Sequence, residues 1–281
     1  MSNPTSRARA AVLRLPGMNC ETETADACRA VGVDAEIVQW NADREYVASF
    51  DAYVLPGGFS YQDRVRAGVI ASKEDVLEVV VEGAESGKPV IGICNGAQVL
   101  VECGLVPGVN PGSVDVALAP NAPADGVGGY RCRWVHLAVP PGTCSPMVSG
   151  LLGQAAVPMP VAHAEGRFTS RVDGLFDELE SRGQVVLRYV RPDGSDARGA
   201  PANPNGSHGD VAGLCNPEGN VVAMMPHPER ATWLRQVPTA VGGHWGEARR
   251  SATGSSEQMT GPGPGRAIFE GLAAALELVI R

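Results

Sequence analysis

Residues 90–100 of the chain read VIGICNGAQVL, and this stretch decides how the fold is interpreted. An apolar run that is typical of a buried strand leads directly into the helix-like sequence AQVL. Cys94 stands between the two, with Gly92 and Gly96 on either side. Glycines relieve the crowding of a sharp strand-to-helix turn, which exposes the side chain at its tip. The stretch therefore predicts an exposed cysteine at a strand end, although a cysteine that fills core space explains these residues alone equally well.

Strand-like and helix-like segments alternate on the N-terminal side of this stretch. Apolar runs predict strands at residues 10–15, 36–40, 51–55 and 89–93, and helical spacing predicts helices at residues 21–31 and 72–86. Ser72, with Asp75 three residues later, is interpreted as the N-cap of the second helix. This βαβ order predicts an α/β fold with a flavodoxin-like, mostly parallel sheet and flanking helices.

The C-terminal half of the chain has a different pattern. Apolar and polar residues partly alternate at residues 129–139. Residues 157–168 begin as a strand and end in a glycine-containing loop, and another strand-like run follows at residues 184–190. Two further runs bracket the turn sequence NPEG at residues 216–219, which indicates a hairpin. These features predict an additional small antiparallel portion.

The 281 residues are interpreted as one domain, residues 1–281, with its core at residues 10–232. The Pro/Gly/Asn-rich residues 191–209 predict a long surface loop. The Gly/Pro/Ser-rich residues 242–265 predict a loosely packed linker. Apolar spacing over residues 266–280 predicts a C-terminal helix that packs on the sheet.

Composition narrows the class of protein. The net charge of −8, with no basic stripe, argues against nucleic acid and anionic membranes as partners. No apolar run reaches the ~18 residues that a membrane span needs. Seven cysteines without metal-type CxxC pairs favour reduced thiols in a cytoplasmic protein.

A second glycine turn falls at the same predicted sheet edge as Cys94. The strand at residues 51–55 runs into Pro56-Gly57-Gly58, which is a strong turn signal. In open parallel sheets, ligands bind beyond the carboxyl ends of the strands. We therefore expect Gly57, Gly58 and Cys94 to be neighbours in space.

A nucleophilic cysteine needs a base, and the base needs a group that orients it. His227 lies in the sequence MMPHPER after a predicted strand. Pro228 favours an extended backbone at His227, so that His227 and Glu229 project to the same side. These residues predict a Cys94, His227, Glu229 arrangement at one sheet edge.

A second His-x-Glu pair, His163 and Glu165, leaves a metal site as an alternative. Two such pairs match the donor types of a four-ligand site, but nothing requires them to converge, and Cys94 stays unexplained. The sequence therefore predicts no metal. The other histidines, at 136, 208 and 244, receive no role, and the other cysteines, at 20, 28, 103, 132, 144 and 215, are interpreted as structural.

Several segments together resemble the class I, or triad, glutamine amidotransferases. Among these enzymes, the resemblance is to the glutaminase subunits of phosphoribosylformylglycinamidine synthase, which act in purine biosynthesis. The segments that carry it, in the family's order, are LPGMNCETETADA, LPGGFSYQDRVRAG, GICNGAQVL, VAHAEGRF, NPNGS and VAGLCNPEGNVVAMMPHPER.

The resemblance implies roles for individual residues. It implies that Cys94 attacks the carboxamide of glutamine, that His227 serves as base and then acid, and that Glu229 is the partner of His227. The backbone N–H groups of Gly58 and Asn95 would form the oxyanion hole. The substrate contacts implied are Gly57, Phe59, Gln98, His163, Ala164 and Glu165.

The resemblance also implies partners and cofactors. Ammonia would pass to the formylglycinamidine ribonucleotide synthetase large subunit, with a small accessory subunit as a further partner. ATP and Mg²⁺ would bind that synthetase, because this chain has no phosphate loop and needs no cofactor of its own. Three rival functions stay open at this stage: a glutaminase that feeds another ammonia acceptor, a cysteine hydrolase or peptidase, and a module that senses glutamine.

Overall fold

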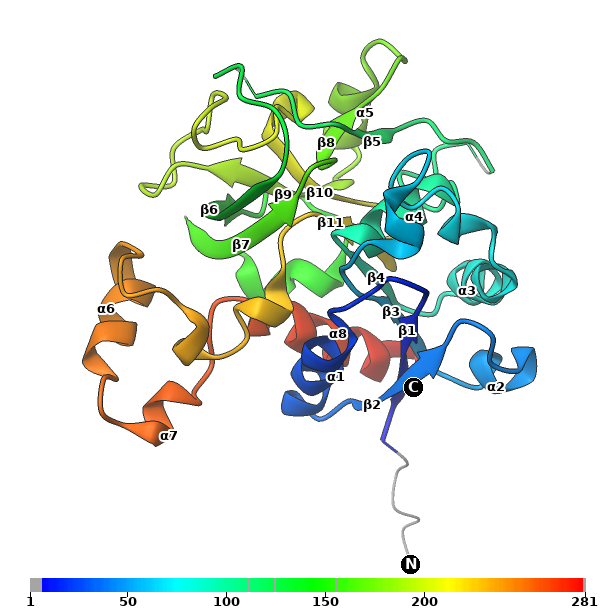
Figure 1. The fold of residues 1–281 in the computed structure, drawn as a ribbon, viewed down its shortest axis with the longest axis horizontal. Coiled ribbons are helices and arrows are strands. Elements are labelled where there is room, and N and C mark those ends of the chain that lie inside the picture. The colour runs from blue at the N-terminus through cyan, green and yellow to red at the C-terminus, as the bar shows by residue number, and fades with distance from the viewer. Residues whose placement is uncertain (1–6, 111, 124, 155, 280–281) are drawn as a thin grey trace, which may run out of the picture.

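A computed structural model describes residues 7–110, 112–123, 125–154 and 156–279 of the chain. The fold is built on a nine-stranded sheet with the strand order β2-β1-β3-β4-β11-β10-β9-β6-β7, and β5 pairs with β8 in a separate two-stranded sheet (Figure 1). The strands are β1 (Arg9–Arg14), β2 (Asp34–Gln39), β3 (Ala52–Leu55), β4 (Val90–Ile93), β5 (Ala117–Ala119), β6 (Arg131–Ala138), β7 (Val157–His163), β8 (Arg167–Thr169), β9 (Val185–Val190), β10 (Val211–Cys215) and β11 (Val221–Met224). The helices are α1 (Glu21–Ala30), α2 (Arg44–Ala48), α3 (Asp75–Glu85), α4 (Asn95–Glu102), α5 (Leu175–Ser181), α6 (Gly243–Ser251), α7 (Ser256–Met259) and α8 (Arg266–Val279).

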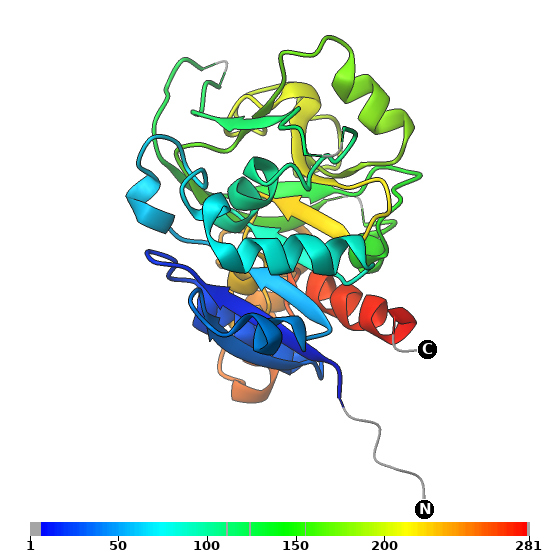
Figure 2. The same cartoon turned by 90° about the vertical axis from the view of Figure 1, so that its right-hand side faces the viewer.

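The nine-stranded sheet has a parallel half and an antiparallel half. Strands β2, β1, β3, β4 and β11 are parallel neighbours. From β11 through β10, β9 and β6 to β7, every pairing is antiparallel. In Figure 2 the blue strands of the parallel half lie below the green and yellow strands of the sheet. The predicted α/β fold class is confirmed.

The central strands are apolar because both of their faces are covered. Every residue of β3 (AYVL), β4 (VIGI) and β11 (VVAM) is buried. Fully covered parallel strands read as continuous apolar runs of this kind. Helix α4 packs on these three strands and is buried along its whole length.

A C-terminal helix, α8, is present as predicted. Helix α8 buries Ile268, Phe269 and Leu272 and packs against α1 and the 3₁₀ turn Pro146–Leu151. Residue 280 lies outside the described residues. No helix in the described ranges is both long enough and apolar enough to cross a membrane.

The predicted linker at residues 242–265 is wrong, because this segment contains α6 and α7. Both helices project to one side of the molecule in Figure 1, in orange. They have a small apolar cluster of their own, in which Leu234, Val237, Val241 and Ala252 pack with Trp245 and Met259. Gly and Ser are frequent in residues 242–265, so the few widely spaced apolar residues give no clear helical pattern in the sequence. His244, which belongs to the predicted linker, lies in α6.

Two further local predictions need correction. Ser72 lies in a 3₁₀ turn, Ala71–Lys73, and α3 begins only at Asp75 with Glu74 as its N-cap residue. Residues 191–209 do form a long loop, but Asn205 and Ser207 are buried rather than on the surface. Asn205 Nδ2 donates to the Gly166 carbonyl over 2.7 Å. The loop at residues 191–209 therefore anchors the loop between β7 and β8.

The strand directions bring five segments to one edge of the sheet. The carboxyl ends of β1, β3, β4 and β11 meet there because these strands are parallel. Strand β10 runs opposite to β11, so β9 has the direction of β11 again. Strand β6 runs opposite to β9, so β7 has this direction as well. Five of the segments at this edge, those that follow β1, β3, β4, β7 and β11, carry the residues of the candidate site.

Candidate active site

Cys94 occupies the predicted sharp turn between β4 and α4. Its φ of 51° and ψ of −104° are rare for a residue with a side chain, and such strain is typical of a nucleophile turn. A Cβ at Gly96 would lie 2.0 Å from the Leu55 carbonyl oxygen, so only glycine lets α4 start so close to β3. The Cys94 thiol lies 3.5 Å from the Ala162 carbonyl oxygen. The prediction of an exposed cysteine is wrong, because Cys94 is only 4% exposed beneath the segments that follow the neighbouring strands.

His227 and Glu229 form a buried pair in the segment that follows β11. His227 Nδ1 and Glu229 Oε1 are 2.5 Å apart, and the two residues are 2% and 0% exposed. The pairing was predicted from an extended backbone, and that reason is wrong, because Pro228–Arg230 forms a 3₁₀ turn. The His227 N–H donates to the Pro160 carbonyl of β7 over 2.9 Å, which fixes the start of this turn.

The surroundings of His227 favour its protonated form. Burial alone lowers its pKa, but the Glu229 carboxylate and the thiols of Cys94 and Cys20 outweigh this and raise the pKa well above its ordinary value. Because Nδ1 faces the carboxylate, Nε2 is the nitrogen free for proton transfer. This nitrogen is buried and has no hydrogen-bond partner among the described residues.

The glycine turn after β3 lies beside the segment after β1. Gly58 has a φ of +155°, and a Cβ there would lie 2.4 Å from the Met18 Cα, so the turn requires glycine. Gly58 and Met18 form an antiparallel bridge whose hydrogen bonds are made by their neighbours: Phe59 N–H to Gly17 and Asn19 N–H to Gly57. The Gly58 N–H consequently points away from the bridge.

Asn95 connects this turn to α4. It is the first residue of the helix, where a backbone N–H has no intrahelical acceptor and the helix dipole favours negative charge. Its side-chain Oδ1 accepts from the Ser60 N–H over 2.9 Å. Its Nδ2 donates to Gln98 Oε1 over 2.9 Å, and Gln98 Nε2 donates to the Glu165 carbonyl over 2.5 Å. Gln98 therefore connects the helix to the loop after β7.

His163 ends β7 and is held in one tautomer. Asn121 Nδ2 donates to the carbonyls of His163 and Gly129, which leaves Asn121 Oδ1 as an acceptor for His163 Nδ1 at 3.2 Å. His163 Nε2 is then a buried acceptor without a partner among the described residues. Burial lowers the pKa of His163 to about 3, so the ring is neutral near pH 7. The remaining predicted contact in this loop, Ala164, accepts from the Asn121 N–H over 2.8 Å.

Two carboxylates stand between the glycine turn and the loop after β7. Glu165 Oε2 accepts from the Ala67 N–H over 3.1 Å, and Asp63 Oδ1 lies 3.3 Å from Asn95 Nδ2. Burial, followed by the charge of Glu165, raises the pKa of Asp63 to about 6. Phe59, the remaining predicted contact, is 42% exposed, and its ring centroid lies 6.2 Å from that of Tyr130.

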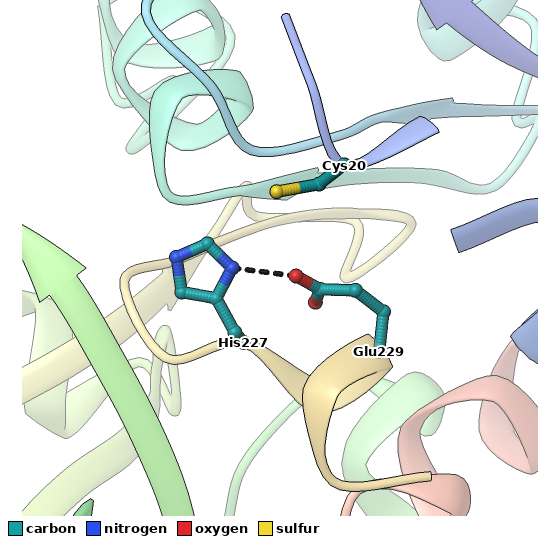
Figure 3. Close-up of side chains that lie close together, drawn as sticks. All are labelled: Cys20, His227 and Glu229. Carbon is teal, nitrogen blue, oxygen red and sulfur yellow. Dashed lines mark hydrogen bonds and ion pairs between the residues drawn. The ribbon is translucent and has the colours of Figure 1, made fainter. Parts of the chain in front are cut away.

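Cys20 is a site residue that the sequence interpretation missed. Figure 3 shows its side chain pointing toward His227 and Glu229. Arg230 Nη2 donates to Cys20 Sγ over 3.0 Å, and the Cys20 N–H donates to the Gly57 carbonyl over 3.2 Å. Burial raises the pKa of Cys20, so the thiol is protonated near pH 7. Its position after the first parallel strand was a signal that it would reach this edge.

Cys20, His227 and Glu229 are also the one set of three metal-type donors whose atoms lie within 4.8 Å of one another in the described ranges. His163 and Glu165 are not part of this set, so the two His-x-Glu pairs do not form one four-ligand cluster. The Arg230 guanidinium lies 3.0 Å from the Cys20 sulfur, and a cation at that place disfavours a second one. The set is therefore better suited to hydrogen bonding than to metal coordination.

These residues form a site that can transfer an acyl group. It contains a thiol on a strained turn, a buried imidazole with a carboxylate partner, and the backbone N–H groups of Gly58 and Asn95, which have no hydrogen-bond acceptor among the described residues. The surrounding segments add the buried polar side chains of Gln98 and His163.

Comparison with known proteins identifies the family. Residues 7–259 match the CobB/CobQ-like glutamine amidotransferase domain. The chain is 42% identical over 274 residues to the phosphoribosylformylglycinamidine synthase subunit PurQ of Methanothrix thermoacetophila, covering 96% of this chain and 98% of the relative. It is 43% identical over 224 residues to the PurQ subunit of Thermomicrobium roseum, covering 79% of this chain and 87% of the relative.

A solved structure supports the same assignment. A chain in the structure of PurLQS from Thermotoga maritima superimposes with a TM-score of 0.67 and 28% identity, covering 98% of this chain and 100% of that one. The resemblance inferred from the sequence is confirmed. The chain belongs to the CobB/CobQ-like glutamine amidotransferases and, among them, to the family of PurQ subunits of phosphoribosylformylglycinamidine synthase.

Proposed function

We propose that this chain hydrolyses glutamine to glutamate and ammonia and supplies the ammonia to an ATP-dependent synthetase subunit. That subunit converts formylglycinamide ribonucleotide to formylglycinamidine ribonucleotide, as the PurQ names of the relatives imply. The observation that carries the proposal, in a chain of this family, is the buried His227–Glu229 pair. It is supported by the strained turn at Cys94, whose thiol is among the groups that raise the pKa of His227.

The chemistry follows from the positions of these groups. His227 Nε2 takes the thiol proton of Cys94 while the sulfur attacks the carboxamide carbon of glutamine. The Gly58 and Asn95 N–H groups hold the resulting oxyanion. The intermediate collapses as His227 returns the proton to the leaving nitrogen, which departs as ammonia. His227 then deprotonates a water molecule, which attacks the γ-glutamyl thioester and releases glutamate.

The substrate contacts are Gly57, Phe59, Gln98, His163, Ala164 and Glu165. His163 has the clearest support, because its unpartnered Nε2 lone pair complements an N–H group of glutamine. His163→Phe keeps a ring of similar size but removes this acceptor. We expect the KM for glutamine to rise about tenfold with a smaller change in kcat. An unchanged KM would remove His163 from the substrate contacts.

The partners and the location of the chain follow from the same proposal. ATP and Mg²⁺ bind the synthetase subunit, and a small accessory subunit completes the assembly, as the name PurLQS suggests for the Thermotoga maritima protein. Residues 1–281 act as one amidotransferase domain, because a single sheet joins β2 to β7. The seven free thiols fit a cytoplasmic location.

Reconstitution tests the proposal. The purified chain is mixed with a formylglycinamidine ribonucleotide synthetase that alone uses only ammonia, and amidine formation from glutamine is measured. We expect glutamine to support synthesis only when both proteins are present. A chain that hydrolyses glutamine but never supports this synthetase would instead feed a different ammonia acceptor. A chain that hydrolyses peptides and not glutamine would be a peptidase.

A further inference from the structure

Arg230 lies beside Glu229, but the Glu229 carboxylate remains paired with His227. Arg230 Nε lies 3.7 Å from Glu229 Oε1, while His227 Nδ1 lies 2.5 Å from the same oxygen. An arginine normally forms a tighter, two-point pair with a carboxylate. Some other contact must therefore hold the guanidinium back from Glu229.

Cys20 provides that contact. Its sulfur accepts from Arg230 Nη2 over 3.0 Å, and Glu23 Oε1 lies 3.5 Å from the same nitrogen. The sulfur is 1% exposed and belongs to the segment after β1, which does not otherwise take part in the proposed reaction.

The backbone of Cys20 also fixes the neighbouring turn. The Cys20 N–H donates to the Gly57 carbonyl, and a Cβ at Gly57 would lie 2.7 Å from His227 Cε1 and 3.2 Å from Cys20 Sγ. The turn, the sulfur and the imidazole are thus in direct contact. Figure 3 shows the sulfur beside the His227–Glu229 hydrogen bond.

We propose that Cys20 is a positioning residue for glutamine hydrolysis: its thiol anchors Arg230, so that Glu229 stays paired with His227. The proposal rests on the proposed function. Without the sulfur, the guanidinium can close the 3.7 Å gap and compete for the carboxylate. His227 would then lose part of the interaction that favours its charged form.

The prediction concerns kcat/KM and its pH dependence. The charged or titratable side chains that influence His227 and its pair are Cys20, Cys94, Tyr130, His163, Glu229 and Arg230. In the reconstituted complex, Cys20→Ala should lower kcat/KM for glutamine by on the order of 10- to 100-fold. In the pH profile of kcat/KM, the limb that reports the ionisation of His227 should move to lower pH in Cys20→Ala. Cys20→Ser, which retains an acceptor, should recover part of both losses.

Two comparisons separate positioning from a general loss of stability. Cys28→Ala removes another buried thiol of the same region, from α1, and should leave the profile unchanged. In an Arg230→Met background, Cys20→Ala should cause a smaller shift, because there is no guanidinium left to restrain and only the direct effect of the thiol on His227 is lost. An unshifted profile for Cys20→Ala, or the same shift in both backgrounds, would overturn the inference. A wild-type complex that does not hydrolyse glutamine would instead overturn the proposed function.

A second and independent observation concerns Cys144 and Cys215, whose sulfur atoms are 3.2 Å apart. The Cys144 N–H donates to the Gly183 carbonyl and the Cys215 N–H to the adjacent Gln184 carbonyl, both over 2.9 Å. Two neighbouring carbonyls thus hold the two cysteines side by side. Cys215 ends β10, which runs opposite to β11, so the pair lies at the sheet edge away from the site.

We infer that this dithiol forms a disulfide when it meets a peroxide. Cys144 is partly exposed, whereas burial raises the pKa of Cys215, so Cys144 is the thiol that reacts first. Its sulfur bonds to one peroxide oxygen, the O–O bond breaks and water leaves. Cys215 then attacks this sulfur, the S–O bond breaks, and a second water leaves with its proton.

Mass spectrometry of the full chain tests this inference. After treatment with hydrogen peroxide, we expect the loss of two hydrogens and a peptide link between residues 144 and 215. The Tm should rise by roughly 5–10 °C, and dithiothreitol should reverse the rise. Cys144→Ser should abolish the link, whereas Cys132→Ser, which removes an exposed thiol, should not. Oxidation without this link would overturn the inference.

Discussion

Cys94→Ala should reduce glutamine-dependent amidine synthesis by at least about 10⁴-fold, while ammonia-dependent synthesis by the partner continues at its normal rate. Alanine cannot form the thioester, and the turn between β4 and α4 contains no cysteine besides Cys94. Alanine also keeps the Cβ that the backbone at φ 51° already accommodates, so the fold should survive. Both rates can be measured on one preparation of the reconstituted complex.

A matched control is available on the same helix. Cys103 follows the last residue of α4, and its sulfur is directed to the Ser72 carbonyl at 3.8 Å, away from the site. Cys103→Ala should therefore retain both activities. Glutaminase activity that survives Cys94→Ala would contradict the proposed mechanism, and loss of both activities would indicate damage to the complex.

His227→Ala should lower kcat for glutamine hydrolysis by about 10³- to 10⁴-fold, because the same residue moves protons in both halves of the reaction. Glu229→Gln should cost less, since the base is still present and only its charged partner is lost. The Glu229 carboxylate raises the pKa of His227, so its removal should move the His227 limb of the pH profile to lower pH. Steady-state kinetics between about pH 5 and 9 measure both effects.

His136→Ala is the control for the His227 and Glu229 substitutions. It lies on β6, where burial lowers its pKa, and no part of the proposed reaction uses it. His136→Ala should change kcat by less than a factor of two or so. If Glu229→Gln proved more harmful than His227→Ala, the assignment of base and partner would have to be exchanged or abandoned.

The parts of the fold that the sequence predicts are those set by local patterns. The apolar runs of β3, β4 and β11 and the glycines around Cys94 carry their own signals, because covered strands and sharp turns each need particular residues. The pairing of His227 with Glu229 was also predictable, since the two residues are close in sequence. Its geometry was not, because the 3₁₀ turn depends on packing against β7.

What the sequence did not reveal depends on contacts between distant segments. Cys20 and Arg230 are 210 positions apart, and their contact follows from the order of the strands, which no local pattern encodes. Asn121 is similar, because an isolated asparagine in a loop gives no sign that it orients His163. The helices α6 and α7 were missed for another reason: glycine and serine outnumber the few apolar residues that hold them.

The convergence of five strand ends has a consequence for the chain while it is being synthesised. The nucleophile belongs to the first third of the sequence and the base to the last quarter, and they meet only when β11 has inserted beside β4. A nascent or truncated chain that ends before β11 would carry Cys94 without a base to activate it. Such premature products of translation would therefore be unable to release ammonia from the cell's glutamine, so that activity would require a chain that extends at least through Glu229.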